Sequence, residues 1–144
     1  MGRAASPAPL PLLGEDNMEI DRLQGVENLE NREFIFCCLD YLKDRLHINQ
    51  ILATLTDAEQ CGKLFFCRPG KAILLEVTNM DESEIRQARY DGGSQVRYYN
   101  DLFRINDRAF LVTNYWYKSV SEVKSNRKVK DNRTPFLQWV KAQK

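Results

Sequence analysis

The amino-acid sequence predicts an α+β fold, with N-terminal helices packed on a mainly antiparallel sheet and a C-terminal helix that closes the domain. Apolar residues recur at helical spacing over 32–46. An aromatic and β-branched run with a turn at its centre covers 95–117. A helix signal, Thr134 followed by a proline, opens the last segment of the chain.

The length of 144 residues favours one domain with a sizeable core. Residues 1–20 are rich in proline at their start and contain only a short, interrupted apolar stretch, too short for a signal peptide. We therefore expect a disordered leader over 1–20 and a single α+β domain over 21–144.

The N-terminal helices are predicted from apolar spacing and caps. In 32–46 the positions that recur are Ile35, Cys38, Leu39, Leu42 and Leu46, while Phe36 lies off this stripe. A second helix follows over 48–55. Thr56 and Glu59 have the spacing of a capping box and predict a short third helix that ends near Gly62.

Two further elements lie between these helices and the aromatic run. Residues 64–67 and 72–77 flank a Pro-Gly pair, which predicts a second hairpin whose later arm is a central, buried strand. Asn79 or Asp81 can cap a helix over 82–89 that ends at a glycine pair. A winged-helix arrangement would use this hairpin as its wing, but Asp57 and Glu59 make the helix before it a poor reader of DNA.

The run over 95–117 predicts a central hairpin with its turn near Asp107. If Asp107 and Arg108 form the turn, one face of the hairpin carries four apolar side chains, namely Phe103, Ile105, Phe110 and Val112. Neighbouring residues of a strand point to opposite faces, so the aromatic pair at 98–99 and the triplet at 115–117 cannot all face inward.

The charge is divided unevenly along a chain whose net charge is +1. Residues 1–60 contain 5 Lys or Arg and 11 Asp or Glu, whereas 108–144 contain 9 Lys or Arg and 2 acids. This split predicts a basic C-terminal part that either binds an anion or docks on the acidic half. The charged stretch 118–133 is predicted to be a mobile loop.

The sequence argues against several classes of protein. It has no apolar run of about 20 residues, so we expect no membrane partner. The cysteines (Cys37, Cys38, Cys61 and Cys67) form no CxxC pair and follow no export signal, which predicts free thiols and a soluble, cytoplasmic protein. With His47 as the one histidine, we expect no metal and no cofactor, and an enzyme with an unrecognised pocket is the least favoured class.

Two classes of function remain ahead of an enzyme. The first is a protein-interaction or homo-oligomerising module that buries surplus aromatic residues, for which the candidates are Tyr98, Tyr115, Trp116 and Tyr117. The second is a nucleic-acid-binding accessory module that combines basic and aromatic side chains. Its candidate residues are Arg97, Tyr99, Arg104, Arg108, Lys124, Arg127, Lys128, Lys130 and Arg133.

Overall fold

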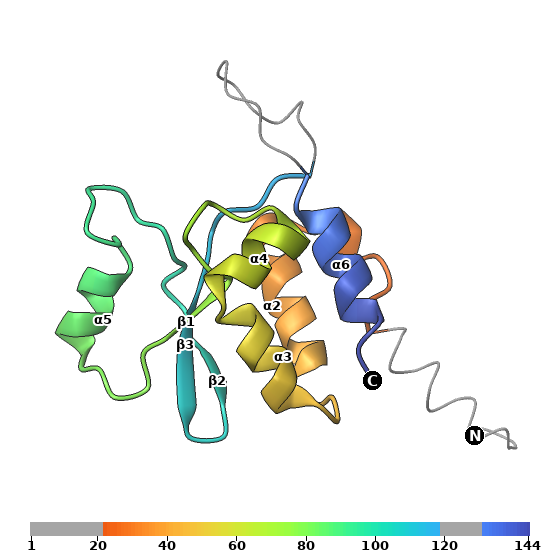
Figure 1. Ribbon diagram of the computed structural model, residues 1–144, viewed down its shortest axis with the longest axis horizontal. Helices are drawn as coiled ribbons and strands as arrows, with labels where there is room; N and C mark the ends of the chain where they lie inside the picture. Colours follow the sequence, from red (N-terminus) through yellow and green to blue (C-terminus); the bar gives the residue numbers. More distant parts are fainter. Residues whose placement is uncertain (1–21, 119–130) are drawn as a thin grey trace, which may run out of the picture.

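The computed structural model describes residues 22–118 and 131–144 and confirms the α+β class, with helices, a three-stranded antiparallel sheet and a C-terminal helix (Figure 1). The predicted leader over 1–20 lies outside the described residues. The elements in chain order are η1 (Val26–Asn28), α2 (Asn31–Leu42), α3 (Ile48–Leu55), α4 (Ala58–Phe65), β1 (Leu74–Glu76), α5 (Glu82–Ala88), β2 (Phe103–Ile105), β3 (Arg108–Val112) and α6 (Arg133–Lys141).

The central hairpin of the sequence prediction is confirmed as β2 and β3. Phe103 pairs with Phe110 and Ile105 pairs with Arg108, so the turn is one residue earlier than Asp107-Arg108. Asn106 adopts a left-handed backbone there, with φ of 54°, a conformation that asparagine tolerates better than most residues.

The second predicted hairpin is wrong. Residues 64 and 65 complete α4, and Phe66 ends it in a left-handed conformation with φ of 52°. β1 pairs with β3 instead, and the strand order β1-β3-β2 puts β1 at an edge of the sheet and β3 at its centre. The wing of a winged-helix arrangement is therefore missing from this part of the described chain.

Two helix boundaries differ from the prediction, at the start of α4 and at the end of α2. Thr56 does not cap α4, because its hydroxyl donates to the Leu52 carbonyl at 2.8 Å, at the end of α3. Asp57 is the N-cap and accepts from the Gln60 N–H at 3.1 Å. The helix predicted over 32–46 ends at Leu42, so Leu46 lies in a turn and is 80% exposed.

The sheet has a different cover on each face. Helices α2, α3, α4 and α6 cover one face, and α5 lies on the other (Figure 1). The first face carries the four apolar hairpin residues predicted to share it. Phe136 of α6 lies at the centre of this core, with its ring centroid 5.2 Å from that of Phe65, 6.2 Å from that of Phe34 and 5.1 Å from that of Trp116.

Asn132, just before α6, is fully buried and joins the two chain segments that meet there. Its Nδ2 donates to the Tyr115 carbonyl at 2.7 Å, and its Oδ1 accepts from the Tyr117 N–H at 2.8 Å. The backbone N–H of Asn132 also donates to the Tyr117 carbonyl at 3.1 Å. These bonds satisfy buried backbone groups that no strand pairing reaches.

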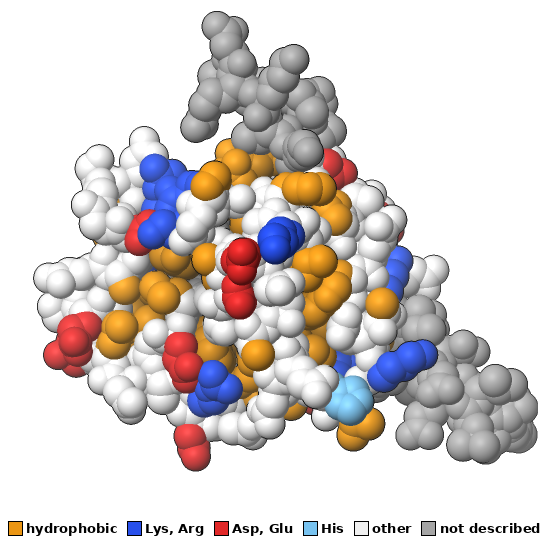
Figure 2. All heavy atoms as spheres, viewed as in Figure 1, with side chains coloured by type: hydrophobic (Ala, Val, Ile, Leu, Met, Phe, Trp, Pro, Cys, Tyr) orange, Lys and Arg blue, Asp and Glu red, His pale blue; other side chains and the backbone are white. Residues whose placement is uncertain are grey.

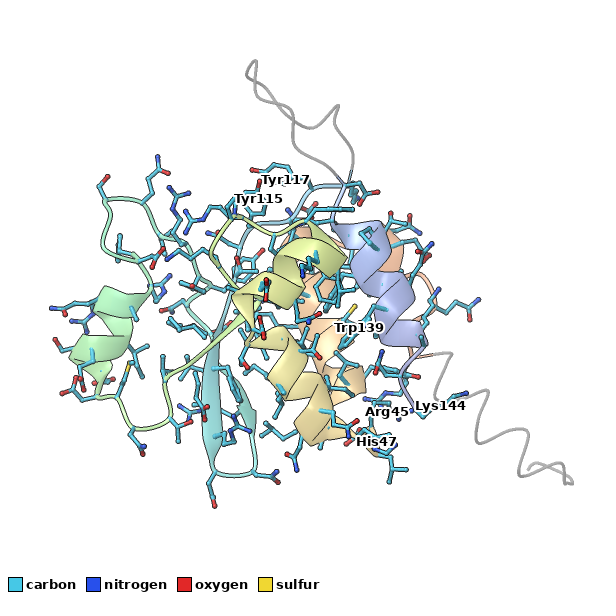
Figure 3. The ribbon with its side chains drawn as sticks, in the orientation of Figure 1. Arg45, His47, Tyr115, Tyr117, Trp139 and Lys144 are labelled. Carbon is cyan, nitrogen blue, oxygen red and sulfur yellow. The ribbon has the colours of Figure 1, made fainter. Side chains whose placement is uncertain are left out.

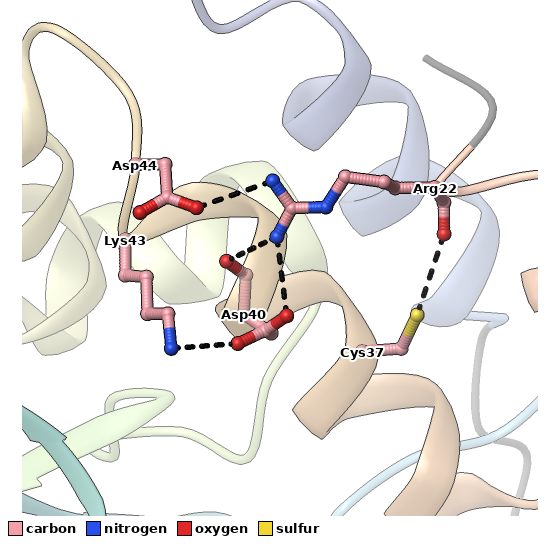
Figure 4. Close-up of polar contacts among 5 residues, drawn as sticks. All are labelled: Arg22, Cys37, Asp40, Lys43 and Asp44. Atoms are coloured by element: carbon pink, nitrogen blue, oxygen red, sulfur yellow. Dashed lines mark hydrogen bonds and ion pairs between the residues drawn. The ribbon is translucent and has the colours of Figure 1, made fainter. Parts of the chain in front are cut away.

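Arg22 attaches the first described residues to α2 (Figure 4). Its guanidinium reaches Asp40 at 3.1 Å and Asp44 at 3.2 Å, and Lys43 is 2.8 Å from the other oxygen of Asp40. Hydrogen bonding from Lys43 holds the pKa of Asp40 below its usual value. The acidic residues at this end of α2 therefore have basic partners nearby in the same N-terminal half.

Candidate nucleic-acid interface

The aromatic residues proposed as a partner surface divide into buried and accessible pairs. Tyr98 and Trp116 are buried, and the Trp116 indole donates to the Thr113 carbonyl at 2.8 Å, so both belong to the interior. Tyr115 and Tyr117 are partly exposed, with ring centroids 5.1 Å apart and planes at 79° (Figure 3). Of the four candidate aromatic residues, Tyr115 and Tyr117 are therefore the two that a ligand can reach.

Basic side chains lie beside one ring of the accessible pair, that of Tyr115. Arg68, Lys71 and Arg97 line a small surface hollow together with Tyr115. The space-filling view shows Lys and Arg side chains beside hydrophobic ones at the upper left of the molecule (Figure 2). We call Arg68, Lys71, Arg97, Tyr115 and Tyr117 the aromatic–basic surface.

Asp91 neutralises part of the aromatic–basic surface. Its carboxylate lies 2.9 Å from the Arg68 guanidinium and 2.8 Å from the Lys71 ammonium. Hydrogen bonding from Lys71, supported by the charge of Arg68, lowers the pKa of Asp91. Arg97 makes no ion pair among the described residues. The surface therefore retains a positive excess.

Backbone contacts fix the position of Arg97. Its N–H donates to the Arg89 carbonyl at 2.7 Å, and its carbonyl accepts from the Asn114 N–H at 3.1 Å. The Asn114 side chain also donates to the Val96 carbonyl at 3.1 Å. The segment that carries Arg97 is thereby held beside the strand that leads to Tyr115.

Two arginines of the predicted nucleic-acid site are engaged elsewhere. Arg108 forms a fork with Glu76, with both nitrogen–oxygen distances at 2.8 Å, and this bond lowers the pKa of Glu76 to about 2. Arg133 is only 3% exposed and donates to the Asn31 side chain at 2.9 Å and the Glu27 carbonyl at 3.2 Å. Its guanidinium also lies 4.1 Å from the Phe34 ring centroid, so Arg133 belongs to the core.

The other predicted residues occupy different places. Tyr99 packs on Phe36, with ring centroids 6.1 Å apart, and burial raises the pKa of its hydroxyl to about 12. Arg104 of β2 is exposed and points to the α5 side of the sheet, because Phe103 and Ile105 on either side of it point to the main core. The remaining candidates lie outside the described residues, namely Lys124, Arg127, Lys128 and Lys130.

Four basic residues near these sites were not singled out from sequence. Arg68 and Lys71 flank a Pro-Gly turn that was interpreted as a hairpin. Arg86 and Arg89 of the α5 segment are three residues apart, a spacing that puts both on one side of a helix. The three-residue spacing could have indicated that Arg86 and Arg89 lie together. The segments that pack beside each pair of basic residues, however, are set by the tertiary fold.

The described residues contain no cluster of three or more His, Cys, Asp or Glu able to hold a metal ion. His47 is exposed in the turn between α2 and α3, whereas Cys61 is buried and its thiol donates to the Leu55 carbonyl at 3.4 Å. A hollow of about 380 Å³ between η1, α2 and α6 has Glu27 as the one carboxylate among its described lining residues.

No helix in the described ranges combines the length and the apolar character that crossing a membrane requires. Comparison of the chain with protein-family models, with curated proteins and with solved structures finds no match.

Proposed function

We propose that this chain binds single-stranded nucleic acid through the aromatic–basic surface. The observation that carries the proposal is the accessible Tyr115–Tyr117 ring pair, whose centroids are 5.1 Å apart, next to the hollow that Tyr115 shares with Arg68, Lys71 and Arg97. Aromatic rings stack on bases, and neighbouring cations neutralise the phosphates that connect them.

A single strand fits this surface better than a duplex does. Stacking on a tyrosine requires a base whose face is open, and bases inside a duplex already stack on their neighbours. The helix α4, which a winged-helix arrangement would put in a major groove, has Asp57 at its N-cap and Glu59 in its first turn, and these acids would face the phosphates.

The burial of Tyr98 and Trp116 moves the balance from a protein partner toward nucleic acid. Two of the four aromatic residues expected to contact a protein partner, Tyr98 and Trp116, lie in the core instead. Of the two that stay accessible, Tyr115 shares a hollow with Arg68, Lys71 and Arg97, and cations beside an aromatic ring suit the phosphates and bases of a single strand.

Fluorescence anisotropy with a labelled oligothymidylate tests the proposal. Replacing Tyr115 and Tyr117 by leucine should weaken binding by about fivefold or more, because stacking contributes roughly 1–3 kcal/mol per base. The matched control, Tyr115→Phe with Tyr117→Phe, keeps both rings and should bind like the wild type. Equal affinity of the leucine and phenylalanine variants would contradict the stacking role.

The salt dependence of binding isolates the contribution of the basic residues. Removing the side chain that neutralises one phosphate of a single strand should reduce the log–log salt slope by about 0.7. Arg97→Gln should show this change, whereas Lys63→Gln on α4, an exposed lysine outside the surface, should not. A wild type with no salt-dependent binding even at low ionic strength would rule out the proposed function.

Self-association remains the second candidate, and we propose it for the end of α4. Leu64 is 40% exposed and Phe66 is 41% exposed, and these neighbouring apolar side chains could be covered by a second copy of the chain. Light scattering at increasing protein concentration tests it, with Leu64→Ser and Phe66→Ser as variants. A monomer mass at every concentration would exclude this candidate.

A further inference from the structure

A second hollow, of about 250 Å³, lies on the α5 side of the sheet, between α5 and the segment that leads into β2. Its wall contains three arginines, and we call Arg86, Arg89 and Arg104 the arginine hollow. The volume is below the roughly 300–1,000 Å³ typical of pockets that enclose a whole small molecule, so the space suits one chemical group.

The local geometry explains why the three arginines converge. Arg86 and Arg89 are three residues apart at the end of α5, and this spacing puts them on the same side. Arg104 lies in β2 between two residues that point into the main core, so strand alternation directs it toward α5. The Nε–H of Arg89 donates to the Tyr98 carbonyl at 3.3 Å, and this bond holds the Nε end of the guanidinium in place.

The charges of the arginine hollow have little internal compensation. None of the three arginines forms an ion pair among the described residues. Glu82 is the one acid among the described residues that line the hollow. Asp101, close in sequence to Arg104, is paired with Arg32 of α2. Like charges that line one hollow repel one another, and an anion with two negative charges would relieve that repulsion.

We propose that the arginine hollow binds a phosphomonoester dianion. The planar guanidinium groups match the geometry of phosphate oxygens and can bind them in pairs. Ile85 and Leu102 add apolar walls beside the charged groups, which suits a phosphate attached to an organic residue. The site is distinct from the aromatic–basic surface and does not depend on the function proposed there.

Isothermal titration calorimetry with phenyl phosphate tests the site at constant ionic strength. Wild type should bind phenyl phosphate and should bind dimethyl phosphate, a singly charged diester, much more weakly. Arg86→Gln with Arg104→Gln should weaken phenyl phosphate binding by roughly tenfold or more, because the variant cannot form the charge-assisted hydrogen bonds. Both arginines are exposed, so melting curves should show that the double variant stays folded.

The control removes the same charge elsewhere, by Lys63→Gln with Lys144→Gln, both at exposed positions outside the hollow. Equal phenyl phosphate affinity for wild type, control and the double arginine variant would overturn the proposal, as would equal affinity for the monoester and the diester. The Tyr115→Leu, Tyr117→Leu variant should retain phenyl phosphate binding, which separates the two sites.

The phosphomonoester could come from the end of a nucleic-acid strand or from a small molecule. Arg97 and Arg89 are connected by a backbone hydrogen bond, so the aromatic–basic surface and the arginine hollow lie on neighbouring parts of the chain. An oligothymidylate with a 5′-phosphate that binds more tightly than its 5′-hydroxyl form, only while Arg86 and Arg104 are present, would assign the strand end. Equal binding of the two oligonucleotides, with phenyl phosphate still bound, would assign a small phosphomonoester.

Discussion

Replacing Arg133 by methionine should destabilise the fold strongly. The substitution keeps an apolar stem in the core but removes a guanidinium that donates to the Asn31 side chain at 2.9 Å and to the Glu27 carbonyl at 3.2 Å. Hydrogen bonds from a charged group contribute about 1.5–3 kcal/mol each, and the contact with the Phe34 ring adds about 2 kcal/mol when desolvated.

The net loss is smaller than the sum of these contributions, because the variant no longer has to bury a charge. We expect a loss of about 2–4 kcal/mol in the free energy of unfolding, and a fall in melting temperature of roughly 4 °C for each kcal/mol. Urea denaturation followed by circular dichroism measures the first quantity, and a thermal scan measures the second.

Two controls make the Arg133→Met result specific. Arg133→Lys keeps the charge but loses the fork geometry, so its stability should fall between the wild type and the methionine variant. Lys141→Gln removes an exposed charge from the same helix and should change stability by less than about 0.5 kcal/mol. A loss below about 1 kcal/mol for Arg133→Met would refute the structural role of this side chain.

Three further outcomes are expected. Leu42→Ala, a truncation in the core, should cost about 2–5 kcal/mol, and the half-buried Phe36→Ala should cost less in the same urea assay, so the reverse order would contradict the helix phase. Glu76 has a folded pKa of about 2, below its usual 4.5, so its stabilising effect is present above about pH 4.5 and is lost as the pH falls toward 2. Glu76→Gln should remove this pH dependence, which amounts to less than about 1 kcal/mol because the pair with Arg108 is exposed. If the free energy of unfolding of the variant fell between pH 4.5 and 2 as it does in the wild type, the pairing would be rejected. Iodoacetamide at pH 8 should modify the partly exposed Cys37 well before Cys38, whose pKa burial raises to about 12, and mass spectrometry of digested peptides would detect a reversed order.

The elements that could be predicted are those whose signals are local in sequence. The turn at Asn106 and the alternation around it are sufficient to define β2 and β3. The N-cap of α5 is also local, since Asp81, one of the two residues expected to cap this helix, accepts from the Glu84 N–H. Such features need no knowledge of the rest of the chain.

The elements that could not be predicted depend on distant contacts. Leu64 and Phe65 belong to an apolar run that fits a strand as well as a helix. The helix persists there because Phe65 packs against Phe136 and Trp139 of α6, with ring centroids 5.2 and 5.3 Å apart. No residue near position 65 in the sequence indicates that Phe136 and Trp139 are its partners.

The candidate site shows the same division. Tyr115 and Arg97 were recognisable by composition alone, but their shared hollow with Arg68 and Lys71 arises from the tertiary fold. Arg133 was grouped with the basic loop by sequence proximity, yet its partners Asn31 and Glu27 are more than 100 residues earlier in the chain. Composition and proximity in sequence therefore could not show which basic side chains lie together in the fold.

The bonds around Asn132 have a consequence for protein engineering. Because its side chain binds the Tyr115 carbonyl and the Tyr117 N–H, residues 117 and 132 are held next to each other at the start of α6. A flexible peptide inserted between Lys118 and Asp131 would cost only about 0.6 kcal/mol of closure entropy for each doubling of length. This position is therefore suited to carrying a grafted binding sequence or the new termini of a circular permutant, provided that Asn132 is kept.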